Sequence, residues 1–564
     1  MSAYSLIVAL SLAQLVFAQS LIAQLDYGTF QGAYDVKYNI SYWQKIPYAA
    51  PPVGEKRERL VFLNLGLNCL TCRSPFANTR SNTCLRTQVN GSEDCLYLGL
   101  YSRPWAEGQA LRPVVVTFYG GGFVQGSASF TIPPPAYPIL NVSSSSSTTT
   151  DNNGGGGDDG MLFVYPNYRV NAFGFLPGRQ VAADPSSDPN AGLLDQAMAL
   201  RWTQKHIRRF GGDPARVIIW GQSAGGGSVV AQVVSATARQ RHRGLGPSLS
   251  PLFRQALASS PFWPKTYRNE APEAQWRFDR LANLTGCGGA QVSDSLKCLK
   301  QVDVQAIREA SLQISQSHKY TTSYYSWVPV IDGDFLPEPL SKASTAPVKP
   351  WLVDMDTDME ATFSMYNTHE GESFIPPGLG GAGSGGDPPF NASVASFRQW
   401  VAGYLPGFSS ADRQKLEELY PESETTNTSP YNDTYTRAGL VYRDSVLACP
   451  AYWMTGTAPK GSWMGEYTIA PAKHASDVYW WNTVNSSQQT DRLHYEGYAG
   501  AMYSFFMTGD PNAMKLTPEN ISGVPPLKSG LEFVVDERGF STAGLAKFEE
   551  RCNFWLHMAP QIPV

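Results

Sequence analysis

The sequence predicts an α/β protein with a largely parallel sheet flanked by helices. Residues 114–118 (VVVTF) and 162–165 (LFVY) are uninterrupted apolar runs, which are typical of strands covered on both faces. Strand-like and helix-like segments alternate along the chain, as in α/β layer folds. Residues 192–210 have apolar side chains at 193, 197, 200 and 207, and this spacing predicts a helix with one apolar face.

The composition excludes several classes of protein. Of the 564 residues, 42% are hydrophobic and 16% are charged, so the chain is too large and too apolar for a disordered tail or a disulfide mini-protein. Its 44 basic and 48 acidic residues give a formal net charge of -4. This balance leaves no excess of positive charge to neutralise phosphates over a large surface, so we expect no nucleic-acid partner.

The first 18 residues have the pattern of a secretory signal peptide. Their apolar run ends at the small-residue site Val16-Phe17-Ala18 and is too short to span a membrane, and a second possible cleavage site follows Ala23. No later segment reaches the ~20 unbroken apolar residues that a membrane span requires. The sequence therefore predicts a secreted, extracellular protein without a transmembrane anchor.

Two polar, glycine-rich stretches, 143–160 and 376–389, interrupt the pattern of strands and helices. They can bury little surface, and we interpret them as surface excursions. The strand pattern resumes after each of them, so neither is a domain boundary. We expect a signal peptide over 1–18 and a single domain over 19–564.

Sequons and cysteines agree with a secreted protein. Nine Asn-x-Ser/Thr sequons are glycosylation candidates: Asn39, Asn90, Asn141, Asn283, Asn391, Asn427, Asn432, Asn485 and Asn520. The eight cysteines form an even set, which in an oxidising compartment indicates disulfides: Cys69, Cys72, Cys84, Cys95, Cys287, Cys298, Cys449 and Cys552. The Cys69-x-x-Cys72 spacing also occurs in redox and zinc sites, but no second pair lies near it to complete a tetrahedral site. We expect no metal and no cofactor.

A serine lies at the junction of a predicted strand and a predicted helix. Residues 216–220 (RVIIW) lead directly into 221–225 (GQSAG), and a helix-compatible stretch follows. Glycines two positions on either side of Ser223 allow strand and helix to approach, and the tight turn forces Ser223 into a sparsely populated backbone conformation. This geometry exposes the hydroxyl as a nucleophile at a helix N-terminus. The alternative is a tight turn that the glycines make possible, in which the serine has no chemical role.

A glycine-rich loop follows the strand at 114–118. Residues 119–123 read YGGGF, and glycines there let backbone amides face a substrate without interference from side chains. We expect the amides of Gly121, Gly122 and Ala224 to form an oxyanion hole. The simpler interpretation is that the glycines only permit a tight loop.

These motifs, taken in order, resemble the type B carboxylesterase and lipase family, whose relatives include cholinesterases, sterol esterases and secreted microbial lipases. The resemblance covers nearly the whole mature chain and implies an α/β-hydrolase fold and hydrolysis of carboxylic esters. The matching segments are 46–54 (IPYAAPPVG), 92–96 (SEDCL), 119–123 (YGGGF), 167–170 (NYRV), 192–196 (GLLDQ), 210–214 (FGGDP) and 221–225 (GQSAG).

In this family the acid and then the histidine follow the serine. The family places a glutamate in an Asp-Glu-Gly-x-Phe-like segment shortly after a strand, and 358–363 (DMEATF) makes Glu360 the match, although Met359 and Ala361 depart from the pattern. Asp356 and Asp358 lie close enough to compete.

Four histidines follow Glu360 in the chain: His369, His474, His494 and His557. Residues 474–478 (HASDV) resemble the family's His-x-x-acid-aliphatic segment, so His474 is the predicted base. It would take the proton of Ser223 while Glu360 binds the other ring nitrogen.

The resemblance also implies structural features. It implies the disulfides Cys287–Cys298 and Cys449–Cys552, with Cys95 bonded to Cys69 or Cys72 and Cys84 to the other. Arg169 and Asp195 match the family's buried ion pair. Gln222 stands where the family usually has glutamate, which removes a negative charge beside the nucleophile and puts the preference for the leaving group in doubt.

The expected substrate is a small-molecule or lipid ester. Family lipases open an amphipathic flap on lipid, but residues 70–94 are mostly polar with no apolar helical stripe, which argues against strong interfacial activation. Phe123, Trp480 and Trp481 are candidates to line the substrate pocket. The alternatives are a lipase or a sterol- or carotenoid-type esterase, a non-catalytic adhesion or recognition ectodomain, and, more weakly, a peptidase.

Overall fold

The computed structural model describes residues 21–56, 69–72, 92–142, 160–241, 251–289, 292–318, 325–343, 359–381, 390–424, 430–458 and 460–562. The expected signal peptide lies outside these residues, as do most of the two polar stretches. The part of the second stretch that is described contains a 3-10 helix, η8 (Pro377–Gly380), with Leu379 buried.

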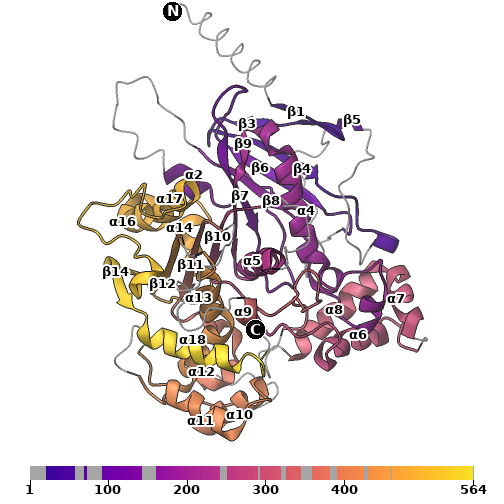
Figure 1. Cartoon of the computed structure of the whole chain (residues 1–564), viewed down its shortest axis with the longest axis vertical. Helices are drawn as coiled ribbons and strands as arrows, with labels where there is room; N and C mark the ends of the chain where they lie inside the picture. Colours follow the sequence, from indigo (N-terminus) through magenta and orange to yellow (C-terminus); the bar gives the residue numbers. More distant parts are fainter. Residues whose placement is uncertain are drawn as a thin grey trace, which may run out of the picture.

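Within the described residues, eleven strands form one sheet in the order β14-β13-β12-β11-β10-β9-β7-β8-β6-β4-β3 (Figure 1). From β13 to β8 in this order, which includes β7, each strand pairs with its neighbour in parallel. Antiparallel pairs extend the sheet at both edges. The bounds are β3 (Ala33–Asp35), β4 (Ile40–Pro47), β6 (Tyr97–Ser102), β7 (Arg112–Phe118), β8 (Leu162–Pro166), β9 (Gly212–Gln222), β10 (Gln255–Ser259), β11 (Ala361–Asn367), β12 (Ser462–Tyr467), β13 (Leu531–Asp536) and β14 (Gly539–Gly544). A small second sheet contains β1 (Ile22–Leu25), β2 (Gly28–Gln31) and β5 (Cys69–Cys72).

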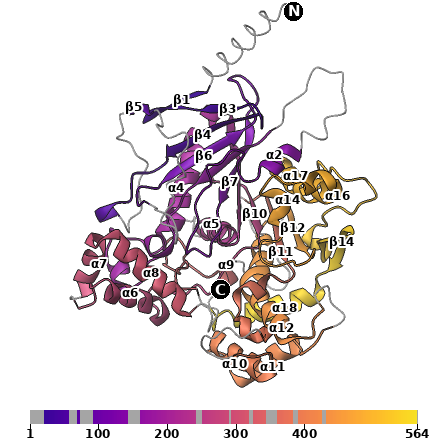
Figure 2. The same ribbon diagram turned by 180° about the vertical axis from the view of Figure 1, so that it is seen from behind.

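Helices cover the sheet and gather in three groups around it. Figures 1 and 2 show α6 to α8 on one flank, α2, α14, α16 and α17 on the opposite flank, and α10 to α12 at one end. The bounds are α2 (Tyr137–Val142), α3 (Arg179–Ala183), α4 (Ala191–His206), α5 (Ala224–Arg241), α6 (Pro272–Leu284), α7 (Val292–Gln301), α8 (Val304–His318), α9 (Leu340–Ala343), α10 (Val394–Tyr404), α11 (Ser410–Leu419), α12 (Thr434–Arg443), α13 (Cys449–Thr455), α14 (Val478–Trp481), α15 (Ser487–Thr490), α16 (Arg492–His494), α17 (Gly500–Thr508) and α18 (Ala546–Met558).

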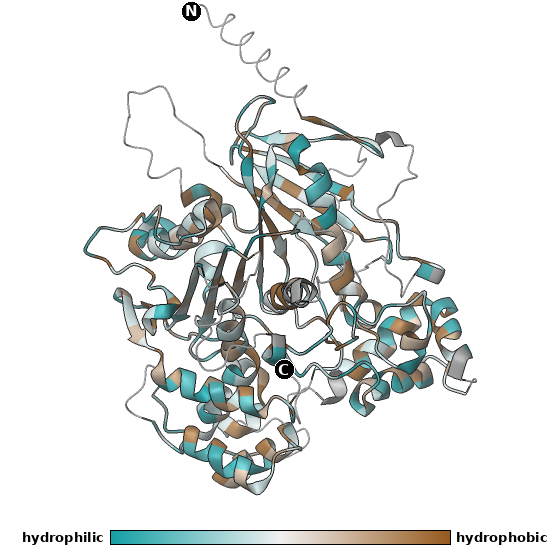
Figure 3. Ribbon diagram, in the orientation of Figure 1, coloured by the Kyte–Doolittle hydropathy of each residue, from teal (hydrophilic) through white to brown (hydrophobic). Residues whose placement is uncertain are grey.

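The central strands are buried on both faces, as their apolar runs predicted. Successive side chains of a strand point to opposite faces, and in β7 Val114 and Val116 pack in the same core as Val229 of α5, whereas Val115 packs in a second core with Phe506 of α17. In Figure 3 hydrophobic residues, in brown, run along the central strands, and the helices carry both hydrophobic residues and hydrophilic residues, in teal. Among the described residues, no helix has the length and apolarity needed to cross a bilayer.

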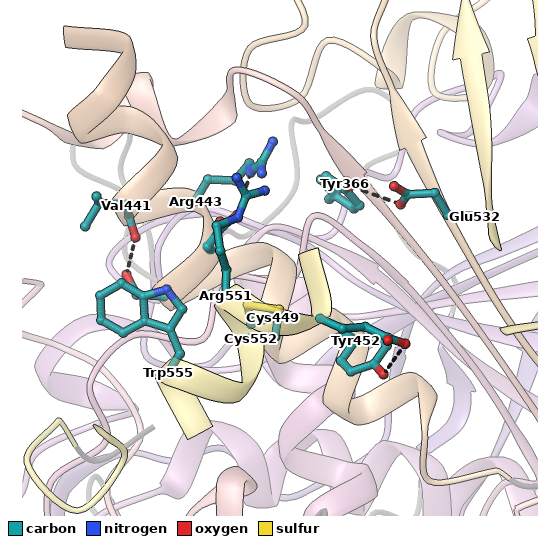
Figure 4. The surroundings of a disulfide bond; sticks show 12 residues. Tyr366, Val441, Arg443, Cys449, Tyr452, Glu532, Arg551, Cys552 and Trp555 are labelled. Carbon is teal, nitrogen blue, oxygen red and sulfur yellow. Dashed lines mark hydrogen bonds and ion pairs between the residues drawn. A yellow bond between two sulfur atoms is a disulfide. The ribbon is translucent and has the colours of Figure 1, made fainter. Parts of the chain in front are cut away.

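The structure contains both disulfides that the family resemblance implied. Cys287 bonds to Cys298, and Cys449 of α13 bonds to Cys552 of α18 (Figure 4). Cys95 is also disulfide-bonded. Its partner lies outside the described side chains, so the pairing among Cys69, Cys72, Cys84 and Cys95 stays a prediction. The ion pair between Arg169 and Asp195 is buried, with 2.7 Å between nitrogen and oxygen.

A group of buried charges lies beside the Cys449–Cys552 disulfide (Figure 4). Asp444 pairs with Arg443 at 2.8 Å and with Arg551 at 2.9 Å, and Arg443 also lies 3.5 Å from Glu466. Burial and the charge of Glu466 hold the pKa of Glu532 well above its usual range.

Lys265 is buried at the end of α10. Its ammonium group donates a hydrogen bond to the carbonyl of Tyr404, the last residue of that helix, and lies 4.4 Å from the centre of the Tyr404 ring. A cation at this position interacts favourably with the C-terminal end of the helix dipole. Burial nevertheless lowers the pKa of Lys265 to about 7, because removing a charge from water is costly.

This low pKa predicts that the structure becomes more stable as the pH rises above neutral. The unfolded chain keeps a proton on Lys265 up to about pH 10, whereas the folded protein releases it near pH 7, so the folded state gains up to about 1.4 kcal/mol per pH unit in between. Urea unfolding of the wild type and Lys265→Met between pH 6 and 9 should show the wild type gaining stability relative to the variant. The matched control is Lys415→Met, which removes an exposed lysine of α11. Parallel curves for wild type and Lys265→Met would contradict the assignment.

Candidate active site

Ser223 lies at a sharp turn between β9 and α5. Its φ is +59°, a strained conformation for a residue with a side chain. The two flanking glycines are required: a Cβ on Gly221 would lie 2.3 Å from the backbone of Gly225, and a Cβ on Gly225 would lie 2.0 Å from the carbonyl oxygen of Phe118. The structure therefore has the strained turn that the sequence predicted, and it holds the Ser223 side chain at the carboxyl end of the parallel strands.

His474 meets this serine from a loop that follows β12. Its Nε2 lies 2.8 Å from Oγ of Ser223, which is hydrogen-bonding distance. The other predicted candidates lie elsewhere: His369 contacts Glu372, His494 contacts Asp491, and His557 is exposed on α18. Of the four histidines weighed from the sequence, only His474 reaches the serine.

The acid beside His474 is Glu370, and the prediction of Glu360 is wrong. Glu370 is fully buried, and its Oε2 lies 3.0 Å from Nδ1 of His474. Glu360 precedes β11, at the opposite end of that strand, where it is half exposed and pairs with Arg254 at 3.2 Å. Seven strand residues separate the two ends by about 20 Å, so Glu360 cannot reach the histidine. Asp356 and Asp358 lie outside the described residues.

The sequence contained a signal for Glu370 that the prediction missed. Residues 370–371 (EG) follow the segment 361–366 (ATFSMY), and the glutamate-glycine pair of the family's segment occurs there and not at 360–361. The glycine is required by packing, because a Cβ on Gly371 would lie 1.8 Å from the carbonyl oxygen of Gly439 in α12. The family's glutamate follows a strand, whereas Glu360 precedes one, because β11 begins at 361.

Buried polar groups hold the loop that carries Glu370. Arg443 donates a hydrogen bond of 3.0 Å from Nη1 to the carbonyl of Thr368, and the Thr368 hydroxyl donates to Glu466 at 2.9 Å. On the other side of Glu370, the Tyr435 hydroxyl donates to the carbonyl of Glu372 at 2.7 Å. The backbone is therefore fixed two residues before and two residues after the acid.

The glycine-rich loop lies against the serine. A Cβ on Gly120 would lie 3.0 Å from the Cβ of Ser223. Gly121 and Gly122 have φ of +120° and +65°, conformations that favour glycine. Ala224 is the first residue of α5, where backbone amides have no partner within the helix. The three predicted oxyanion donors thus come from two segments that meet at Ser223.

Gln222 contributes no charge to this site. Its Nε2 lies 3.5 Å from Nε2 of His474, at the limit of a hydrogen bond. The resemblance places a carboxylate at this position, and here a neutral amide stands in its place. The carboxylate in contact with the His474 ring is that of Glu370.

Aromatic rings form a wall beside the histidine, and we call Phe262, Tyr325, Phe374 and Tyr442 the aromatic wall. The centre of the Phe374 ring lies 4.9 Å from that of His474 and between 5.3 and 6.0 Å from those of the other three. These rings belong to the core on the α5 side of the sheet, whereas Trp480 and Trp481 belong to the opposite core. The two tryptophans are therefore not part of the aromatic wall, and their place in the substrate pocket stays a prediction.

Phe123 lies close to the wall but is itself fully buried. Its ring centre is 6.4 Å from that of Phe262 and 5.1 Å from that of Phe175. Across the described part of the chain, no group of three or more His, Cys, Asp or Glu side chains could hold a metal ion.

Comparison with known proteins agrees with this geometry. The model of the carboxylesterase family matches residues 19–519. Carboxylesterase patB of Aspergillus clavatus is 28% identical over 475 residues, covering 82% of this chain and 75% of its own. Lipase 4 of Diutina rugosa is 30% identical over 565 residues, covering 91% and 93%. The crystal structure of EstA from Aspergillus niger, 24% identical, shares the α/β-hydrolase fold with a TM-score of 0.76 over 96% of this chain and 99% of that one. The protein belongs to the carboxylesterase family and is a serine ester hydrolase.

Proposed function

We propose that the protein is a secreted carboxylic ester hydrolase that forms an acyl-enzyme on Ser223, with His474 as base and Glu370 as acid. The observation that carries this proposal is the continuous row of hydrogen bonds, 2.8 Å from Ser223 to His474 and 3.0 Å from His474 to Glu370. A hydroxyl, an imidazole and a carboxylate in this row form the arrangement that activates serine in acyl transfer.

In the proposed mechanism, neutral His474 carries its proton on Nδ1 and donates it in a hydrogen bond to Glu370. Nε2 takes the proton of Ser223 as the oxygen attacks the ester carbonyl carbon. The amides of Gly121, Gly122 and Ala224 bind the oxygen that becomes negative. The imidazolium then gives its proton to the departing alcohol, and water releases the acid from Ser223 by the same steps.

The aromatic wall supports esters with a bulky apolar acyl or alcohol group, because rings beside the base exclude water and offer apolar contact. The names of relatives support the ester class: one is a chlorogenic acid esterase of Aspergillus niger, 31% identical over 330 residues. A lipase is the second candidate, favoured by the similarity to Lipase 4 over nearly the whole chain. A non-catalytic adhesion role is disfavoured because the serine, the base and an acid are all present and aligned.

Secretion is part of the proposal. The expected signal peptide over 1–18, the disulfides and the similarity to a secreted lipase of Botryotinia fuckeliana, 28% identical over 349 residues, support it. In this proposal the mature protein begins near residue 19, and 19–564 act as one catalytic domain.

The assignment of Glu370, and not Glu360, as the catalytic acid predicts opposite outcomes for two matched substitutions. Glu370→Gln removes the charge that orients and stabilises the imidazolium, and should lower kcat by about 10³- to 10⁴-fold. Glu360→Gln removes only an exposed ion pair, worth less than about 1 kcal/mol, and should leave kcat within about twofold. Hydrolysis of p-nitrophenyl butyrate measures both. A large loss in Glu360→Gln with normal activity in Glu370→Gln would reverse the assignment.

A chain-length series tests the reaction and the substrate class together. Wild type and Ser223→Ala are compared on p-nitrophenyl esters from acetate to palmitate, with near-UV circular dichroism to confirm that the variant is folded. We expect turnover by the wild type and a loss of at least about 10³-fold in the variant. A maximum at long acyl chains supports the lipase candidate. Absence of turnover of every ester by folded wild type contradicts the proposed function.

The secretory route predicts glycans at exposed sequons. Five sequon asparagines are exposed in the structure: Asn39, Asn283, Asn391, Asn432 and Asn520. Asn141 and Asn485 are partly buried, and Asn90 and Asn427 lie outside the described residues. Protein secreted from a eukaryotic host should lose mass on treatment with peptide-N-glycosidase, with modified peptides among the five exposed sites. An unchanged mass would contradict passage through a glycosylating compartment.

A further inference from the structure

The amide of Gly122, one of the proposed oxyanion donors, is oriented by bonds to the other side of its own peptide group. The carbonyl of Gly121 accepts hydrogen bonds of 3.1 Å from the amides of Val124 and Gln125. A peptide group is planar and trans, so the N–H of Gly122 points in the direction opposite to the carbonyl of Gly121. The amide of Gly122 therefore faces away from the two donors, and among the described residues no backbone carbonyl accepts a bond from it.

The peptide group that donates to Gly121 is itself held from outside the glycine-rich loop. The amide of Val124 and the carbonyl of Phe123 belong to one peptide group, and this carbonyl accepts a hydrogen bond of 2.7 Å from the amide of Asn171. Phe123 has a φ of +61°, a conformation that is costly for a bulky side chain and persists only where the surroundings hold it. The bond from Asn171 thus holds the end of the loop in a strained conformation.

Asn171, Phe123 and Gly121 therefore begin a row of hydrogen-bonded peptide groups that ends at the oxyanion hole. Asn171 donates to the carbonyl of Phe123, and the N–H of that same peptide group donates to the carbonyl of Gly121. The N–H of this second peptide group is the donor of Gly122. Hydrogen bonds in such a row polarise one another, so that each bond strengthens the next donor. Both the direction and the strength of the Gly122 donor thus depend on Asn171.

The side chain of Asn171 fixes its own backbone. Asn171 is buried, and its φ of +57° lies in the left-handed region, which asparagine enters more readily than most residues because its side chain bonds locally. Its Oδ1 accepts hydrogen bonds from the amide of Ala172 and from the hydroxyl of Ser311, the second at 2.5 Å. The amide of Ala172 can only donate, so the oxygen of the Asn171 side chain, and not its nitrogen, faces both partners.

Ser311 of α8 directs its hydroxyl out of its own helix. A serine inside a helix often donates to the carbonyl four residues earlier. Ser315 does so, with a bond of 2.9 Å to the carbonyl of Ser311, whereas the Ser311 hydroxyl donates to Asn171. Nε1 of Trp327 also donates to the carbonyl of Ser311 at 2.9 Å. Ser311 is therefore a fixed, buried anchor for Asn171.

We propose that Asn171 and Ser311 are positioning residues for the oxyanion hole: Ser311 holds the side chain of Asn171, and Asn171 holds the peptide groups that orient the amide of Gly122. This inference rests on the proposed function, because it assigns a role within the same reaction. Both side chains are buried, so they act through the loop and not on the ester. The oxygen becomes negative only in the tetrahedral state, so a misplaced donor weakens binding of that state and not of the ester.

The test is hydrolysis of p-nitrophenyl butyrate by Ser311→Ala and Asn171→Gly. Alanine removes the hydroxyl, and glycine removes the anchored side chain while it still adopts positive φ. We expect kcat to fall about tenfold, less than the 10²- to 10³-fold that follows complete loss of an oxyanion donor. KM should stay within about twofold, because formation and breakdown of the acyl-enzyme both pass through a tetrahedral state and slow together.

A transition-state analogue separates this role from a merely structural one. An alkyl trifluoromethyl ketone forms a tetrahedral adduct with Ser223, whose negative oxygen occupies the oxyanion hole. Such an analogue gains its affinity from interactions made only in the transition state. Its inhibition constant should therefore rise in both variants by the same factor by which kcat falls.

Ser315→Ala is the matched control, because it removes a hydroxyl one turn further along α8 that binds the carbonyl of Ser311 and not Asn171. Its kcat and its inhibition constant should lie within about twofold of the wild type. In the double variant of Asn171→Gly and Ser311→Ala, the loss should not exceed that of the more affected single variant, because both residues act through one link.

Three results overturn the proposal in variants whose near-UV circular dichroism shows that they are folded. They are a kcat equal to that of the wild type, a fall in kcat without weaker binding of the ketone, and an equal loss in Ser315→Ala. Ser311→Ala alone decides the question if Asn171→Gly does not fold. Wild-type turnover that depends on Ser223 establishes the reaction separately, so failure of the proposed function is distinguished from failure of this inference.

Discussion

The parallel pairing of β9, β10, β11 and β12 is the constraint on which the site depends. Parallel strands present their carboxyl ends at one edge of a sheet, so segments that follow different strands meet there. Ser223 follows β9, Glu370 follows β11 and His474 follows a loop after β12. Residues 251 positions apart in the chain thereby come within a hydrogen bond of each other. A carboxylate at the amino end of any of these strands, such as Glu360, lies at the opposite end of the strands from Ser223 and His474.

That constraint explains how much of the site could be predicted. Ser223 and the glycine-rich loop are local patterns, in which a strand end and glycines specify backbone geometry within five residues, and the structure has that geometry. His474 was found because its segment has a recognisable spacing. Glu360 was predicted, with Asp356 and Asp358 as its competitors, and Glu370 was not considered, because finding the acid depends on where β11 begins and ends. Residues 361–367 mix polar and apolar side chains, and only pairing with β10 and β12 defines that strand.

The aromatic residues show a second limit of sequence reasoning. The pattern could not tell Trp480 and Trp481 from Phe374, because all three are large, apolar and near a candidate catalytic residue in the chain. The sheet separates them into two cores, and Phe374, which packs against the core on the α5 side, lies 4.9 Å from His474 between ring centres. Buried charges were equally hidden: nothing in the sequence indicated that Arg443 binds the backbone of Thr368 and thereby holds the acid loop.

The central claim is that one serine among many is activated by the row from Glu370 to His474. The most direct measurement is reaction of the folded protein with a fluorophosphonate, followed by mass spectrometry of the intact chain and of its peptides. The account predicts a single adduct, carried by the peptide that contains Ser223, and its absence in denatured protein. An adduct on another residue, or no adduct on the folded protein, would contradict it.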